Sequence, residues 1–242
     1  MSKIIAVWGA PNSGKTTFAT KLALSIYETY SSTVLGLFCN NQTPVLPVIF
    51  PNKKADDLYS IGVPLSKTDI TSTDVVKSIV TIKNKQNLGF LGYKDCENIY
   101  TYPSYDDNKA KAFLTVLKAL ADFVVVDCSA ELDGLSAVAV EMADVVFRLA
   151  TPDLKNMSFY SSQLPLYGDS KFKTAEHIIG LTITENELYL PTEEMKTYLG
   201  DVSFVLPYCK EVKVQMLNGE LTAPIKNNKY KEMVCKIAQK VV

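Results

Sequence analysis

A short stretch near the start of the chain, residues 7–17, has the residue types and the spacing of a phosphate-binding loop. It reads G-x-x-x-x-G-K-T and lies between an apolar run of strand length, residues 4–8, and a segment at 17–26 with apolar residues at helical spacing. Glycines at positions 9 and 14 let the backbone approach a phosphate closely, and the following helix directs free N–H groups and its positive dipole end at the anion. The pattern predicts binding of a nucleoside triphosphate.

Two side chains of this loop have predicted roles of their own. Lys15 supplies a mobile cation for the β- and γ-phosphates, and the hydroxyl of Thr16 is placed to hold Mg²⁺. The backbone N–H groups of residues 12–16 complete the cradle for the phosphates. The predicted cofactor-binding residues of the loop are Gly9, Asn12, Ser13, Gly14, Lys15, Thr16 and Thr17.

A carboxylate further along the chain completes the predicted metal site. Asp127 ends the apolar run at 123–127, which has the length and composition of a buried strand. Ligands of open parallel sheets bind at the carboxyl ends of the strands, where a carboxylate can orient Mg²⁺ through water. We therefore expect Thr16 and Asp127 to hold the metal, and favour this over a strand-end Asp127 that only caps a turn.

The composition limits the possible partners. The chain has 242 residues, 47% of them hydrophobic and 21% charged, with a net charge of −1, which gives no general attraction to nucleic acid or anionic membranes. Arg148 is the only arginine, although DNA-binding proteins use arginine heavily to read bases. We expect little or no binding to duplex DNA, and we expect no arginine finger.

Cysteine and histidine usage excludes other chemistries. The five cysteines are scattered without C-x-x-C spacing, which is typical of reduced thiols, and His177 is the only histidine. A Ser-His-Asp triad and a histidine-based metal site are therefore excluded. The sequence shows neither a signal peptide nor an apolar stretch long enough to span a membrane, so we expect a cytoplasmic protein.

The elements that must position these residues alternate along the chain. Apolar runs predict strands, and apolar residues at helical spacing predict helices between them. Because continuously apolar strands that alternate with helices indicate a parallel sheet covered on both faces, the predicted fold is a single doubly wound, mostly parallel α/β sheet. We read residues 1–242 as one domain. The expected strands are 4–8, 33–39, 87–93, 98–102, 123–127, 145–150, 178–183 and 202–206, and the expected helices are 17–26, 75–80 with its cap at 72–74, 106–121, 137–143 and 154–166.

The end of the chain carries an apolar stripe on a basic helix, over residues 230–241. Such a helix can lie on an anionic membrane, but this one lacks Phe, Trp and Leu on its apolar face. We favour ordinary docking on the sheet over membrane contact.

Taken in order, these segments resemble the ParA/MinD superfamily of P-loop ATPases over residues 1 to about 225. The resemblance rests on the loop at 9–16, the strand VLGLF that leads to Asn40, the run ADFVVVDCS through Asp127, MADVV followed by TPD, and VLPY, which ends at Tyr208. It implies an ATP-dependent switch that dimerises face to face across two nucleotides, and that positions plasmids, chromosomes, division proteins or envelope machines. It also places Pro207 and Tyr208 near the base, switch I at 40 to about 46 and switch II at 127 to about 135.

The chain departs from the family pattern at two places. Ala10 stands where the family carries a second lysine that reaches the partner's phosphates, with Lys53 and Lys54 as the only substitutes in view. Phe38 and Asn40 stand where switch I usually presents aspartates, and Asn40 can hydrogen-bond a water without accepting its proton. With Lys15, Asp127 and Asn40 as the catalytic residues, we expect a slow Mg²⁺-dependent ATPase and a weak ATP-dependent homodimer. These departures resemble the TadZ/CpaE-like branch, which marks sites of pilus or secretion machinery.

Other classes of protein share the loop. A GTPase would need Asp-x-x-Gly at residues 127–130, which read DCSA here, and a later Asn-Lys-x-Asp motif to bind guanine, which this chain lacks. The sequence therefore does not favour a GTPase. An iron–sulfur ATPase would need paired cysteines, and the flanks of Cys96 and Cys128 do not match. Two alternatives stay open: a small-molecule kinase, which would normally supply several arginines, and a non-hydrolysing scaffold that recruits an unidentified protein partner.

Overall fold

Strands that run largely parallel form the framework of the computed structural model, which describes residues 2–131, 134–186 and 189–242. Within these residues one sheet has the order β3-β4-β2-β5-β1-β6-β7-β8, and every neighbouring pair is parallel except the antiparallel pair of β3 and β4. This arrangement confirms the predicted fold class. The strands are β1 Lys3–Gly9, β2 Val34–Phe38, β3 Val80–Ile82, β4 Lys85–Gly92, β5 Phe123–Asp127, β6 Val145–Ala150, β7 Ile178–Thr182 and β8 Val202–Leu206.

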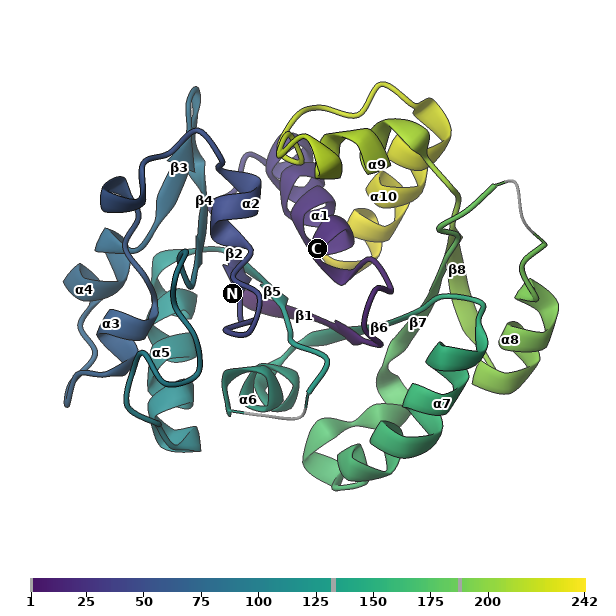
Figure 1. Ribbon diagram of the computed structural model, residues 1–242, viewed down its shortest axis with the longest axis horizontal. Helices are drawn as coiled ribbons and strands as arrows, with labels where there is room; N and C mark the ends of the chain where they lie inside the picture. The colour runs from purple at the N-terminus through teal and green to yellow at the C-terminus, as the bar shows by residue number, and fades with distance from the viewer. Residues whose placement is uncertain (1, 132–133, 187–188) are drawn as a thin grey trace.

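Helices cover both faces of the sheet (Figure 1). Four short 3₁₀ segments, η1 Ala55–Asp57, η2 Leu164–Tyr167, η3 Ser170–Phe172 and η4 Thr174–Glu176, join them in the described chain. Side chains of Thr71, Asp106, Asp153 and Asn227 accept a backbone N–H at the start of their helices, which fixes where each begins. The helices are α1 Lys15–Tyr30, α2 Leu46–Ile49, α3 Gly62–Leu65, α4 Ser72–Lys77, α5 Asp107–Leu120, α6 Gly134–Met142, α7 Leu154–Gln163, α8 Thr192–Leu199, α9 Lys210–Leu217 and α10 Asn228–Val241.

The alternation of side chains along β1 shows how the two layers of core arise. Ile4, Ala6 and Trp8 join the apolar cluster beneath α5, α6 and α7, whereas Ile5 and Val7 join the cluster beneath α1 and α10. Because successive strand residues point to opposite faces, a strand buried on both sides must be apolar throughout. This requirement explains the continuous apolar runs of the sequence.

Two sequence predictions of local structure are wrong. Residues 98–102 form turns and not a strand, because Asn98 Oδ1 accepts the N–H of Tyr100 and Thr101 Oγ1 accepts the N–H of Asn98. The helix expected at 75–80 with a cap at 72–74 is α4, which is capped by Thr71 and ends at Lys77. Val80 instead begins the edge strand β3, which lies antiparallel to β4.

Other boundaries shift by a few residues. The helix expected at 154–166 ends at Gln163 and continues as 3₁₀ helix η2, whose Pro165 has no N–H to donate to an α-helical bond. The sequence patterns predict none of α2, α3, α8 and α9. These helices are short, and their stability comes from packing more than from a long amphipathic pattern.

The C-terminal helix α10 lies beside α1 (Figure 1). Its apolar side chains at 230, 234, 237, 238 and 241 are all buried in the cluster that α1 covers. The expected docking of this helix is therefore confirmed. In the described ranges, no helix combines the length and the apolarity needed to cross a bilayer.

Candidate nucleotide-binding site

Three strands of the sheet end side by side and bring three loops together. Val7 of β1 and Phe38 of β2 are both in register with Asp127 at the end of β5. The loops that follow these strands therefore share one edge of the sheet, at the N-terminus of α1. They surround a cleft of about 730 Å³.

Glycine is required at both ends of the phosphate loop. Gly9 has a φ of 150°, and a Cβ placed on it would lie 2.1 Å from the carbonyl oxygen of Leu149. Gly14 has a φ of 82° and immediately precedes α1, in the left-handed region that favours glycine. The two glycines thus let the loop turn tightly and direct the first N–H groups of α1 at the cleft.

Asp127 and Thr16 form the centre of the cleft. The Thr16 hydroxyl donates to Asp127 Oδ2 at 2.6 Å, and the other carboxylate oxygen, Oδ1, is buried without a hydrogen-bond partner in the described structure. Burial raises the pKa of Asp127 to about 6, although the hydrogen bond from Thr16 and the charge of Lys15 both lower it. A buried, incompletely bonded carboxylate is stabilised by a cation.

The donor set fits Mg²⁺. This ion binds through one or two protein oxygens and keeps waters and substrate phosphates as its other ligands. Thr16 Oγ1 and the carboxylate of Asp127 supply such oxygens beside the phosphate loop. Among the described residues, no group of three or more His, Cys, Asp and Glu forms a metal cage. A magnesium ion here would therefore depend on the phosphates of a bound nucleotide.

Lys15 lies within the cleft and is held by its own loop. Its ammonium donates to the carbonyl oxygen of Ala10 at 2.8 Å. Burial lowers the pKa of Lys15, while the nearby carboxylate of Asp127 opposes that shift. An anion bound on the loop would add a second negative neighbour and favour the charged form of the lysine.

The cleft brings together most of the residues predicted from the sequence. Gly9 and Ser13 do not reach it, because both are buried behind the loop, and the hydroxyl of Ser13 has no described partner. The predicted residues that line the cleft are Asn12, Gly14, Lys15, Thr16, Thr17, Asn40 and Asp127.

A second hollow of about 230 Å³ adjoins the cleft along Gly14 and Thr17. Pro207 and Tyr208, predicted to lie near the base, line this hollow. Apolar side chains of α9 and α10 form part of its remaining wall, among them Val212, Met216 and Tyr230. An apolar pocket with a few polar groups suits a flat heterocyclic ring.

The expected switch I and switch II segments meet across the cleft. Asn40 Oδ1 accepts the backbone N–H groups of Gln42 and Thr43, so its carbonyl is engaged in its own loop. Gln42 Nε2 donates to both carboxylate oxygens of Glu131, each at 2.9 Å. Residues 132–133 of the expected switch II lie outside the described residues. The role of Asn40 with an attacking water stays a prediction.

Sequence reasoning did not single out several residues of the site. Glu131 adds a second carboxylate to the cleft, and Lys213 of α9 adds a second cation that also borders the adjoining hollow. Glu131 falls inside the expected switch II range, which was a usable signal. No local pattern marks Lys213, because α9 reaches the cleft only through the order of the strands.

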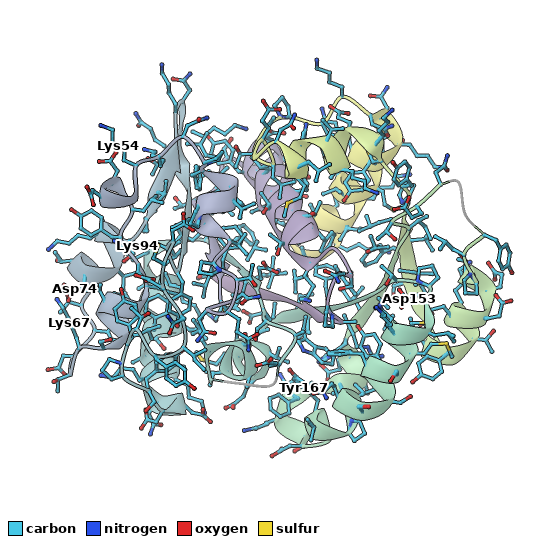
Figure 2. All side chains as sticks on the ribbon, viewed as in Figure 1. Lys54, Lys67, Asp74, Lys94, Asp153 and Tyr167 are labelled. Carbon is cyan, nitrogen blue, oxygen red and sulfur yellow. The ribbon has the colours of Figure 1, made fainter. Side chains whose placement is uncertain are left out.

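Other cations named in the sequence analysis lie elsewhere. Lys53 and Lys54 are exposed and do not belong to the described lining of the cleft. Figure 2 shows Lys54 on the outer side of the molecule. The only arginine, Arg148, is buried in β6 with its guanidinium 5.8 Å from the centre of the Tyr160 ring. None of these cations reaches the place where phosphates would bind.

Comparisons with known proteins identify the fold. No protein-family model and no curated protein matches the chain. Among solved structures, the septum site-determining protein MinD of Pyrococcus horikoshii, complexed with Mg-ADP, superposes with a TM-score of 0.71 at 19% identity and covers 100% of this chain and 96% of its own.

Two further structures agree with that match. A ParA family ATPase of Chlorobium tepidum has a TM-score of 0.77 at 13% identity and covers 98% of both chains. MinD in the MinC:MinD cell division protein complex of Aquifex aeolicus has a TM-score of 0.76 at 15% identity, covering 99% of this chain and 95% of its own. The fold is thus that of the MinD and ParA-family ATPases, as the sequence resemblance predicts.

Proposed function

We propose that this protein is an ATP-binding switch of the ParA/MinD type, a slow Mg²⁺-dependent ATPase that positions or recruits a cellular machine. One observation carries the proposal. The Thr16–Asp127 pair lies beside a glycine-bounded loop at the N-terminus of α1, with a buried carboxylate oxygen that has no described partner. The MinD of Pyrococcus horikoshii, which has a similar fold, was solved in complex with Mg-ADP, and this supports a nucleotide with magnesium as the ligand of this chain.

The residues of this chain divide the work of binding. Lys15 and the N–H groups at the start of α1 would hold the phosphates, while Thr16 and Asp127 would hold Mg²⁺. Bound magnesium would neutralise phosphate charge and orient the γ-phosphate. Pro207 and Tyr208 would hold the base in the adjoining hollow. The Gln42–Glu131 hydrogen bonds would link the two switch segments, so that a conformational change in one segment would alter the position of the other.

Isothermal titration calorimetry with MgATP and MgGTP tests the binding proposal. We expect the wild-type protein to bind MgATP in preference to MgGTP. Lys15→Ala should lose measurable binding, because no other cation of the described loop faces the phosphates. Lys210→Ala, which removes an exposed lysine at the start of α9, serves as the matched control and should bind as the wild type does. Absence of ATP binding, or a clear preference for GTP, would overturn the proposal.

A second candidate function is a nucleotide-dependent scaffold with negligible turnover. The observation in its favour is at Asn40, whose side-chain carbonyl is occupied by two backbone N–H groups of its own loop. Steady-state phosphate release separates the two functions. Release faster than that of Asp127→Ala supports an ATPase, and equal rates support the scaffold. The kinase alternative loses support from the burial of Arg148 away from the cleft.

The cellular role stays at the level of the family. MinD of Aquifex aeolicus was solved as a complex with MinC, so a protein of this fold can bind a protein partner. By analogy we propose an unidentified protein partner from an envelope, division or partition machine. The assignment to the TadZ/CpaE-like branch remains a prediction from the sequence.

A further inference from the structure

Lys213 stands at the boundary between the two hollows of the nucleotide site. It lines the cleft that contains the phosphate loop and also the adjoining hollow that contains Pro207 and Tyr208. Gly14, Thr17 and Met216 are the other residues that line both hollows. A nucleotide with its triphosphate on the loop and its base beside Tyr208 must cross this border. The part that crosses is the ribose and the α-phosphate.

The side chain of Lys213 is already oriented by two neighbours. Its ammonium pairs with Glu185 Oε1 at 2.7 Å and lies 5.9 Å from the centre of the Tyr208 ring. Glu185 belongs to the lining of the base hollow but not to the described lining of the phosphate cleft. The carboxylate therefore attracts the lysine toward the base hollow. The pKa of Lys213 is raised, first by its hydrogen bond to Glu185, so the lysine is charged at neutral pH.

The charges of the cleft give Lys213 a further use. Among the described residues that line it, Lys15 and Lys213 are the cations and Asp127 and Glu131 the carboxylates. ATP brings about four negative charges, and Mg²⁺ offsets two of them. Without Lys213, Lys15 alone would face this anion together with two carboxylates. Lysine binds phosphate as a point charge and needs no fixed geometry to do so.

The ion pair with Glu185 does not prevent this use. The side chains of Lys213 and Glu185 are 48% and 44% exposed, and exposed ion pairs are weak because water screens them. A phosphate oxygen carries a charge of the same sign and can replace the carboxylate as the partner. Helix α9 also holds the lysine in place, since its Val212 and Gln215 are buried.

We propose that Lys213 is a nucleotide ligand that exchanges its ion pair with Glu185 for the α-phosphate when a nucleotide binds. The proposal rests on the nucleotide-binding function above and adds a residue from α9 to it. It makes Glu185 a competitor of the nucleotide. A purely structural ion pair between α9 and the loop after β7 predicts instead that removal of either partner has the same effect.

Titration of MgATP and MgADP into matched variants tests the proposal. Lys213→Gln should weaken binding of both nucleotides by about tenfold and by equal factors, since the α-phosphate is common to them. Glu185→Gln should tighten binding by about twofold, because the competing carboxylate is gone. Lys210→Gln removes a lysine from the same helix that lies outside the described lining of both hollows, and should change nothing. Because the ion pair is exposed, its loss should leave the fold intact. An unchanged midpoint of thermal unfolding in each variant would verify this.

The opposite signs expected for Lys213→Gln and Glu185→Gln make the outcome decisive. Wild-type affinity in Lys213→Gln would overturn the proposal, and so would equal weakening in both variants. A loss confined to MgATP would place the lysine at the γ-phosphate and contradict the assignment to the α-phosphate. If the wild-type protein binds neither nucleotide, the proposed function itself fails. That result is distinct from failure of the Lys213 role alone.

Discussion

At the scale of single residues, burial decides which polar groups of this protein are ready for ligands. Asp127 is 3% exposed and has one carboxylate oxygen without a described partner, although it lies in a cleft with a lysine. A fold optimised for stability alone would leave no such group, because burying an incompletely bonded charge costs free energy. The residue therefore indicates a site for a cation.

Lys21 is buried for a different reason. Its ammonium donates to Gln215 Oε1 at 2.5 Å and to the carbonyl oxygen of Ala223 at 2.8 Å, so it ties α1 to α9 and to the segment before α10. Gln215 is itself bonded to the carbonyl oxygen of Pro224. The lysine thereby holds in place the helix that forms one wall of both hollows.

The pH dependence of stability should report the burial of Lys21. Burial lowers its pKa from 10.5 to about 8, against the opposing charge of Glu211. Between these values the folded protein has released a proton that the unfolded chain still binds, so the free energy of unfolding rises with pH on this account. Relative to Lys21→Met, the wild type should gain roughly 2 kcal/mol between about pH 7.5 and about pH 10. Urea unfolding of both proteins measures the difference, and a flat or falling difference would contradict the assignment.

At the scale of elements, α10 shows how an amphipathic pattern is resolved by packing. Its lysines at 229, 231, 236 and 240 are exposed, while the opposite face is buried against the cluster under α1. A basic amphipathic helix on a membrane would have the same pattern, but its apolar face would be unoccupied in the folded protein. Here the protein's own core covers that face.

Replacement of a core residue of α10 tests the docking. Ile237 is 3% exposed, and Ile237→Ala should lower the free energy of unfolding by about 3 kcal/mol through lost burial and the cavity left behind. Lys236→Ala, one residue earlier and exposed, should change it by less than about 0.5 kcal/mol. Urea denaturation provides both values. Equal, small effects would mean that α10 is not part of the folded core in solution.

At the scale of the whole molecule, charge bears on association. Two subunits that met across their phosphate loops would bring two triphosphates toward one interface. Ala10 contributes no charge there; its side chain is buried and borders a groove of about 980 Å³ between the loop and α7. The other lysine of the cleft, Lys213, is on α9 and does not belong to the described lining of that groove.

We therefore predict an ATP-dependent homodimer that is weak. Ala10→Lys should strengthen it by roughly tenfold, since a cation at this position would offset phosphate charge across the interface. Sedimentation velocity with and without MgATP measures the association of both proteins. A wild-type dimer that is tight without nucleotide and unchanged by Ala10→Lys would show that subunits do not meet across the nucleotides.

The sequence by itself determined the phosphate loop, the Thr16 and Asp127 positions, most strands and the class of the fold. These features are local: a glycine-bounded turn before a helix is encoded by its own residues, and a strand buried on both faces must be apolar along its length. The turn at 98–102 was predicted as a strand, because an apolar pattern does not reveal that the side chains of Asn98 and Thr101 hydrogen-bond to the backbone.

Only the tertiary structure decided which distant residues join the loop. Three distant residues join the site: Glu131 after β5, Glu185 after β7 and Lys213 on α9. Glu131 lies in the expected switch II range, but the sequence around Glu185 and Lys213 gives no sign that these two residues approach the loop. The strand order of the sheet brings these residues together. It places β1 between β5 and β6, with β7 and β8 beyond β6, and α9 follows β8 in the chain. Residue patterns fix conformation over a few residues, whereas the approach of separate loops depends on how the whole sheet is assembled.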